Sequence, residues 1–213
     1  MIEELLEILS FRYPLTETEV GEMSTLKVNG MTFSVKAYKA EGLGHVSVMG
    51  ATGFLGFMKM DTLMINPLEA DLPIYSYDRI YAMGHDTLIV ELYDTLLGEC
   101  PTGAMEAVKA SYAFLPERDP GTHWYDSIKL SCSIAKKSKK KQTNALDALA
   151  KEHMKAYSDM VARPADVAAK REKALAYVDG LLRHGGPSTD VFKQALGSEK
   201  TENLFKTVLF GLS

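Results

Sequence analysis

One acidic residue, Asp78, lies in an otherwise apolar stretch of this 213-residue chain, LPIYSYDRIYA at 72–82. Strand-like alternation places its side chain on the same face as Ile74 and Ile80. Poor solvation favours the neutral form of a carboxyl group and so raises its pKa. An acid that keeps its proton near neutral pH can donate it to a bound substrate. The competing interpretation is structural, with Asp78 capping a turn or pairing with Arg79 or a lysine.

Motifs of nucleotide and metal chemistry are missing from the sequence. The glycine-rich GATGFLG at 50–56 leads into a predicted strand, whereas a dinucleotide fingerprint requires a helix there. No Walker A loop, GxSxG elbow or HExxH pair occurs. Cys100 and Cys132 have no partner motif, so we expect free thiols and no metal or iron–sulfur site. His153 lies on an apolar helical stripe and is expected in the core.

Composition is that of an ordinary soluble globular protein. Hydrophobic residues make up 46% and charged residues 24% of the chain. The formal net charge of −4 argues against general affinity for nucleic acid. No segment reaches the roughly 20 apolar residues of a membrane helix. The start of the chain is acidic and amphipathic, unlike a signal peptide, so we expect a cytoplasmic protein without membrane contact.

The first half of the chain predicts a short helix at 2–11 and then an antiparallel sheet. Asn29-Gly30 stands between two alternating runs and supplies the two positive-φ positions of a type I′ hairpin turn. The connections between strands are too short to hold crossover helices, which makes the sheet antiparallel. The further strands are expected at about 43–50, 54–65, 74–83 and 87–94, with turns near Gly53 and across Gly84-His85.

The second half of the chain is predicted to be mainly helical. Pro164 is at a suitable place to open one of its helices. The helices are expected at 103–114, at 142–162, from Pro164 onward, at 188–196 and at 200–210, with one more strand at 127–134. Residues 1–213 should therefore form a single α/β domain, an antiparallel sheet with helices packed on its faces.

Four segments, taken in order along the chain, share a pattern with a known enzyme family. NPLEADLPIYSYDRI (66–80) is similar to a strand with a catalytic aspartate, at whose position Asp78 stands. DTLIVELYDT (86–95) is similar to the strand that follows, with Glu91 as its acid. His123-Trp124-Tyr125 with SIKLSCSI, and FKQALGSEKTENLFKTVLFGL at 192–212, resemble the later parts. The whole resembles the ferredoxin-dependent bilin reductases and, more distantly, the red chlorophyll catabolite reductases.

This resemblance implies a three-layer α/β/α sandwich, with a central antiparallel β-sheet and helices on both faces, that encloses an open-chain tetrapyrrole such as biliverdin. It implies no permanently bound cofactor or metal. Single electrons would come from reduced ferredoxin or flavodoxin, and the protein would supply protons to the bilin radical, with Asp78 as the catalytic donor. Two alternatives remain open: a tetrapyrrole-binding protein that has lost catalysis, and a flavin-binding split-barrel protein.

The chain departs from the family pattern beside the predicted site. Thr62 stands where one branch has a histidine, five residues before the proline that corresponds to Pro67. The strand that should carry a glutamate contains His45 and Ser47 instead, and Ser76 replaces a glycine. Other branches of the family use aspartates alone. Chemistry that needs a histidine–aspartate pair is thus not expected, whereas chemistry that needs one aspartate is.

Substrate contacts are expected from both halves of the chain. Methionines on a strand face suit a flat, irregular ligand, although such a stripe is also typical of a plain core. Arginines on the long C-terminal helix could bind the tetrapyrrole propionates bidentately, although most basic helix residues are simply solvated. The candidate substrate-binding residues are Met60, Thr62, Met64, His45, Arg171 and Arg183.

A lysine run is the sharpest local charge feature of the chain. Its members are Lys136, Lys137, Lys139, Lys140 and Lys141. Such a run could attract an acidic ferredoxin toward the bilin, an effect that salt would weaken. The alternative is a solvated loop ahead of the helix at 142–162. Nucleic acid is not expected as a partner, because no aromatic residues are interleaved with the lysines.

Overall fold

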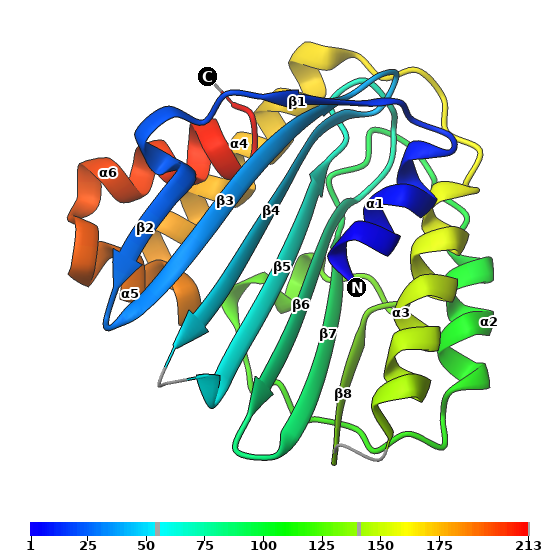
Figure 1. Ribbon diagram of the computed structural model, residues 1–213. Helices are drawn as coiled ribbons and strands as arrows, with labels where there is room; N and C mark the ends of the chain where they lie inside the picture. The colour runs from blue at the N-terminus through cyan, green and yellow to red at the C-terminus, as the bar shows by residue number, and fades with distance from the viewer. Residues whose placement is uncertain (54–55, 140–141, 213) are drawn as a thin grey trace.

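The computed structural model describes residues 1–53, 56–139 and 142–212, which build an antiparallel sheet between two layers of helices (Figure 1). The sheet order is β1-β3-β4-β5-β6-β7-β8, and β2 pairs with β3 further along the same edge. Its strands are β1 (Leu15–Thr18), β2 (Thr25–Val28), β3 (Met31–Ala40), β4 (Gly44–Gly53), β5 (Met58–Asn66), β6 (Ile74–Ala82), β7 (His85–Tyr93) and β8 (Ile134–Lys139).

The helices divide between the two faces of the sheet. On one face lie α1 (Ile2–Ser10), α2 (Gly103–Ser111) and α3 (Thr143–Ser158). On the other lie α4 (Val167–His184), α5 (Pro187–Leu196), α6 (Ser198–Asn203) and the π-helical turn η5 (Leu204–Leu209). Two 3₁₀ helices, η1 (Gly21–Ser24) and η3 (Trp124–Ile128), join these elements. The α/β/α sandwich is confirmed, and the open, linear strand order differs from a closed split barrel.

The hairpin turns are set by residues with positive φ. Asn29 and Gly30 have φ values of 49° and 77°, as a type I′ turn requires, so this prediction is confirmed. In the β6–β7 hairpin the turn residues are Met83 and Gly84, with φ of 52° and 73°. That turn lies one residue earlier than predicted, because His85 already pairs with the last residue of β6.

The strand predicted at 127–134 is wrong. The chain forms η3 at Trp124–Ile128, and the strand runs from Ile134 to Lys139. Asp126 stabilises η3 by accepting hydrogen bonds from the His123 backbone N–H at 2.8 Å and from Lys129 at 2.6 Å. The true strand is hard to recognise in the sequence, because its buried face carries the charged Lys136 and the polar Ser138 after Ile134.

The start of the second long helix also differs from the prediction. Pro164 precedes the helix and forms an isolated bridge with Ala70. The helix α4 begins at Val167, because the Asp166 side chain caps it and accepts the backbone N–H groups of the second and third helical residues at 2.9 and 3.1 Å. The helices predicted at 103–114 and 142–162 also end earlier, at Ser111 and Ser158.

The sheet face that α1, α2 and α3 cover, called the closed face below, carries a fully buried apolar core. Its strand residues Leu63, Ile65, Tyr75, Tyr77, Leu88 and Val90 have no solvent exposure. His153 of α3 is fully buried here, as predicted, and contacts the Tyr75 hydroxyl at 3.3 Å and the Cys132 carbonyl at 3.1 Å. Cys100 and Cys132 are free thiols. Within the described part of the chain, no helix has both the length and the apolar character needed to cross a membrane.

Candidate active site

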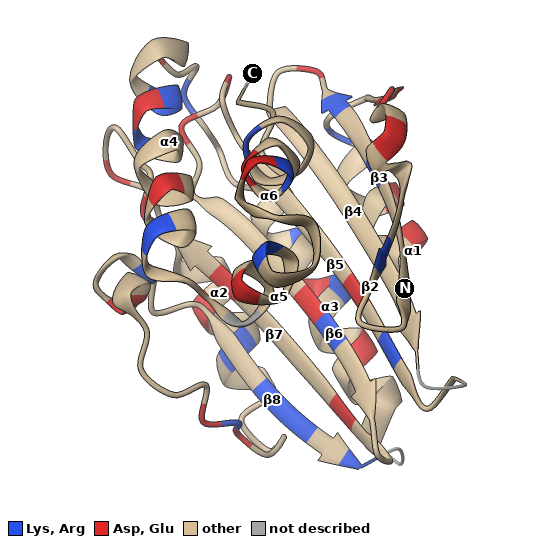
Figure 2. Cartoon of the chain, turned by 90° about the vertical axis from the view of Figure 1, so that its left-hand side faces the viewer, with Lys and Arg blue, Asp and Glu red and all other residues tan. Residues whose placement is uncertain are grey.

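The opposite face, called the open face below, keeps solvent access over the central strands. In Figure 2, α4, α5 and α6 lie over one part of the sheet, and the ends of β6, β7 and β8 near the β6–β7 hairpin have no helix over them. The partly exposed residues of this face on β5 to β7 are Met58, Met60, Thr62, Met64, Asp78, Ile80, Ala82, Ile89 and Glu91. These side chains form a mostly apolar, partly exposed surface around Asp78.

Asp78 lies at the centre of the open face, directly opposite Thr62 in the β5–β6 register. The Thr62 Oγ1 donates a hydrogen bond to Asp78 Oδ1 at 2.6 Å. Burial raises the pKa of Asp78 to about 6; the Thr62 hydrogen bond opposes this, the nearby Glu91 charge adds to it, and Arg118 opposes it. The carboxyl group therefore exchanges its proton within the physiological pH range, which suits a general acid.

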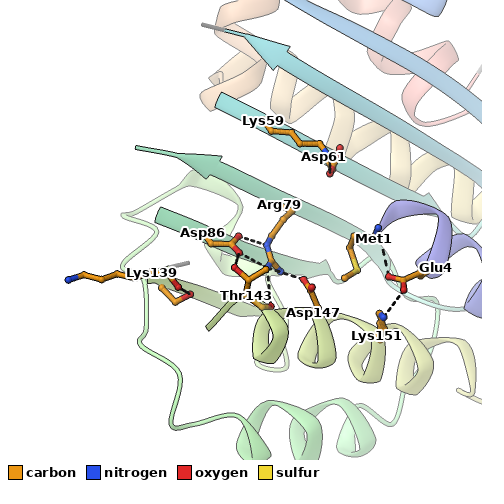
Figure 3. Close-up of polar contacts among 11 residues, drawn as sticks. Met1, Glu4, Lys59, Asp61, Arg79, Asp86, Lys139, Thr143, Asp147 and Lys151 are labelled. Carbon is orange, nitrogen blue, oxygen red and sulfur yellow. Dashed lines mark hydrogen bonds and ion pairs between the residues drawn. The ribbon is translucent and has the colours of Figure 1, made fainter. Parts of the chain in front are cut away.

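Arg79 points to the closed face and is not a partner of Asp78. Its Nε and Nη2 bind the two oxygens of Asp86 at 2.5 and 2.8 Å, and Nη2 also contacts Asp147 of α3 at 3.1 Å (Figure 3). Thr143 donates a further hydrogen bond to Asp86 at 2.7 Å. The structural interpretation in which Asp78 pairs with Arg79 is thus wrong, because neighbouring strand residues face opposite sides of the sheet.

The two predicted methionines flank Thr62 on the open face. Met60 pairs with Ile80 and Met64 with Ser76 in the β5–β6 register. Each pair is therefore the next one along the same face from the Thr62–Asp78 pair. Both methionines are half-buried. The structure thereby brings Met60, Thr62, Met64 and Asp78 together on one surface. The neighbouring residues Lys59 and Asp61 face the other side and pair with each other at 3.7 Å.

An acidic and aromatic group that was not predicted as part of the site adjoins Asp78. Glu91 accepts a hydrogen bond from the Tyr93 hydroxyl at 2.6 Å and lies 3.6 Å from the Lys129 ammonium group. The Tyr93 ring packs against Tyr125 of η3 at 5.4 Å and Tyr177 of α4 at 4.5 Å between centroids. The sequence motif contained Glu91, but only the fold shows that these aromatic rings surround it.

His45 lies further along the open face, beneath the C-terminal segment. Its Nε2 donates to the Val208 carbonyl at 2.8 Å, and a side chain at Gly211 would come within 2.5 Å of the ring. Ser47 and Asn66 donate to the next two carbonyl groups at 2.9 and 2.7 Å. Burial lowers the pKa of His45, so the ring is neutral at pH 7. These three side chains hold the end of η5 on the sheet, and the structure does not bring His45 next to Asp78.

The two predicted arginines occupy different environments on α4. Arg171 is half-buried in the first part of the helix. Arg183 is exposed in the last turn and lines a shallow groove together with Asp179, Lys193 and Glu202. Both acids of that groove pair with Lys206, at 3.0 and 2.7 Å, so the charges around Arg183 do not decide between the two arginines.

The described lysines of the run, Lys136, Lys137 and Lys139, belong to β8 and not to a solvated loop. Lys136 is 1% exposed, forms an ion pair with Glu117 and donates to the Leu115 carbonyl at 3.1 Å. This removes Lys136 from the predicted docking surface, because strand alternation points it into the closed face. Lys137 and Lys139 are exposed on the open side. The predictions for residues 140 and 141 fall outside the described residues.

The described residues contain no cluster of three or more His, Cys, Asp or Glu side chains that could hold a metal ion. Searches of protein-family models and of curated proteins gave no match for this chain. Among solved structures, the chain is similar to phytochromobilin synthase from tomato in complex with biliverdin. The TM-score is 0.80 at 15% sequence identity, over 99% of this chain and 82% of the other. The two proteins therefore share a fold.

Proposed function

We propose that this protein reduces an open-chain tetrapyrrole of the biliverdin type. The observation that carries the proposal is Asp78, a half-buried acid on the open face whose pKa is raised to about 6. The fold it shares with phytochromobilin synthase, solved with biliverdin, supports a bilin as the ligand of this face. The apolar residues around Asp78 suit such a flat, mostly apolar molecule.

Reducing one double bond of a bilin consumes two electrons and two protons. The electrons arrive singly from an external donor of the ferredoxin or flavodoxin type. Asp78 transfers its proton to the one-electron-reduced bilin, and its carboxylate is then stabilised by the hydrogen bond from Thr62 at 2.6 Å. The second proton and the proton that restores Asp78 come from solvent, which reaches this half-open face.

The electron donor docks at the uncovered end of the sheet, where Lys137 and Lys139 are exposed. Two lysines on one strand face attract an acidic protein, and salt screens this attraction. Substituting both by glutamate should lower the second-order rate constant of reduction and weaken its salt dependence, without changing bilin affinity. An unchanged rate constant would contradict docking of the electron donor at these two lysines.

Anaerobic absorbance spectroscopy of the purified protein tests the proposal. Biliverdin is added first, and chemically reduced ferredoxin second. We expect a shifted bilin band on mixing and its conversion to a new chromophore after the second addition. A shifted band without conversion would contradict the reductase function and favour the alternative of a tetrapyrrole-binding protein. No spectral change at either step would exclude both functions.

A further inference from the structure

The inference concerns Glu91, the second acid of the open face. In the β6–β7 register Glu91 is opposite Ser76, so Asp78 is its diagonal neighbour on the same face. Diagonal neighbours on adjacent antiparallel strands lie about 7–8 Å apart. The Glu91 side chain is only 13% exposed, so little water screens its charge from Asp78. The geometry thus places a second carboxylate within electrostatic reach of the proposed proton donor.

Glu91 is held in this position by two partners on different elements. The Tyr93 hydroxyl donates to its Oε2 at 2.6 Å, and the Lys129 ammonium lies 3.6 Å from its Oε1. Lys129 is closer to Asp126, at 2.6 Å. Because the lysine is shared between two acids and nearer to the other, it neutralises the Glu91 charge only in part.

The other ionisable groups around Asp78 act differently. Arg118, half-buried in the segment before β8, acts on Asp78 in the sense opposite to Glu91. Tyr125 of η3 and Tyr177 of α4 face the same acids, and burial raises the pKa of both phenols, so they stay neutral. Thr62 on β5 does not titrate. Glu91 and Arg118 are therefore the two charges that oppose each other at Asp78.

We propose that Glu91 is a positioning residue that lets Asp78 hold its proton to higher pH than it would alone, and that Arg118 acts in the opposite sense. A fixed negative charge disfavours a second one nearby. The same repulsion favours reprotonation of Asp78 after it has donated its proton, so Glu91 would speed the return to the acid form. The catalytic consequence rests on the proposed function, whereas the effect on protonation does not.

The test is a pH titration of Asp78 in the substrate-free protein, by carboxyl carbon NMR or infrared spectroscopy, with Asp78→Asn to assign the signal. Glu91→Gln keeps a group that can accept the Tyr93 hydrogen bond but removes the charge. It should lower the midpoint by about one pH unit, the size expected for unit charges about 7 Å apart in a partly solvated site. Arg118→Gln should raise the midpoint.

Asp61→Asn is the matched control, because Asp61 lies next to Thr62 on β5 but faces the other side of the sheet. It should leave the midpoint unchanged. The proposal is overturned if Glu91→Gln leaves the midpoint unchanged or raises it, or if Asp61→Asn shifts it equally. If Glu91→Gln folds poorly, Arg118→Gln tests the proposal independently, because its titration midpoint should rise; an unchanged or lower midpoint would contradict the proposal.

The pH profile of bilin reduction separates this proposal from the proposed function. In Glu91→Gln the alkaline limb of the profile should move to lower pH by the same amount as the titration midpoint. A shifted titration in a protein that reduces no bilin would reject the function and keep the electrostatic role of Glu91. Bilin reduction together with an unshifted titration midpoint in Glu91→Gln would keep the function and reject the electrostatic role of Glu91.

Discussion

The two faces of the central sheet hold their acids in different ways. On the closed face, Asp86 receives both the Arg79 guanidinium and the Thr143 hydroxyl. On the open face, Asp78 receives the Thr62 hydroxyl, and no ion pair joins it to a cation within residues 1–53, 56–139 and 142–212. Both acids belong to the same β6–β7 hairpin. The cation stabilises the ionised form of Asp86, whereas burial of Asp78 without such a cation favours its protonated form and lets it exchange a proton near pH 6.

The two faces of the sheet also differ in how their side chains pack. On the closed face the hydroxyl of Tyr157 donates to the Pro73 carbonyl at 3.0 Å, and its ring packs 4.8 Å from that of Tyr75. Both tyrosines are fully buried. On the open face, the side chains of Met60 and Met64 are partly exposed to solvent. One side of the sheet is thus fully packed, whereas the central strands of the other side keep partial solvent access.

The largest effect on stability is expected from the closed face. Asp86→Ala leaves the Arg79 guanidinium, 8% exposed, with only the partial charge compensation of Asp147. The free energy of unfolding should fall by about 3 kcal/mol, because an uncompensated buried charge is costly. Urea denaturation measures this. Asp61→Ala, which removes an exposed pair with Lys59, is the control and should change stability by less than about 1 kcal/mol.

On the open face, Asp78→Asn is expected to raise the free energy of unfolding above pH 6, whereas Asp86→Ala lowers it. The Asp78 pKa of about 6 lies above that of an unfolded chain, so the protonated form favours the folded state. This stabilisation is complete below about pH 4 and is lost as pH rises through 6. The asparagine variant should therefore match the wild type at pH 3.5 and be more stable by about 3 kcal/mol at pH 8. Equal stabilities at both pH values would contradict the raised pKa.

A smaller effect is expected from Thr62→Val, which keeps the shape of the side chain and removes the donor to Asp78. Because that hydrogen bond favours the ionised form, its loss should raise the pKa of Asp78 by a further amount of about one unit. The pH profile of reduction should extend to higher pH. Thr62→Ser retains the hydroxyl and should behave like the wild type; a shift in the serine variant would point to packing as the cause.

Local sequence signals predicted those parts of the fold that depend on neighbouring residues. Asn29-Gly30 specified its hairpin through backbone conformation, and alternation along 74–82 placed Asp78 on one face with Ile74 and Ile80. The spacing of Thr62 and Asp78 from the family pattern pointed to two residues that lie opposite each other on adjacent strands. Short-range chemistry was sufficient for the hairpin and the strand face, whereas the relation of Thr62 to Asp78 came from the family resemblance.

Contacts between distant residues could not be predicted in this way. Lys136 is buried only because Glu117 and the Leu115 carbonyl meet it in the folded chain. His45 binds a carbonyl 163 residues away, which no local pattern encodes. The charge around Asp78 likewise depends on Arg118, which precedes β8 and reaches the site only through the tertiary fold.

The central claim is that the chemistry belongs to Asp78 on the open face. Its most direct test compares single-turnover reduction of bound biliverdin in the wild type, in Asp78→Asn and in Asp61→Asn. We predict unchanged bilin binding in all three, wild-type reduction in Asp61→Asn, and a loss of roughly 10²–10⁴-fold in Asp78→Asn, the usual contribution of a general acid. Wild-type reduction by Asp78→Asn would contradict the claim.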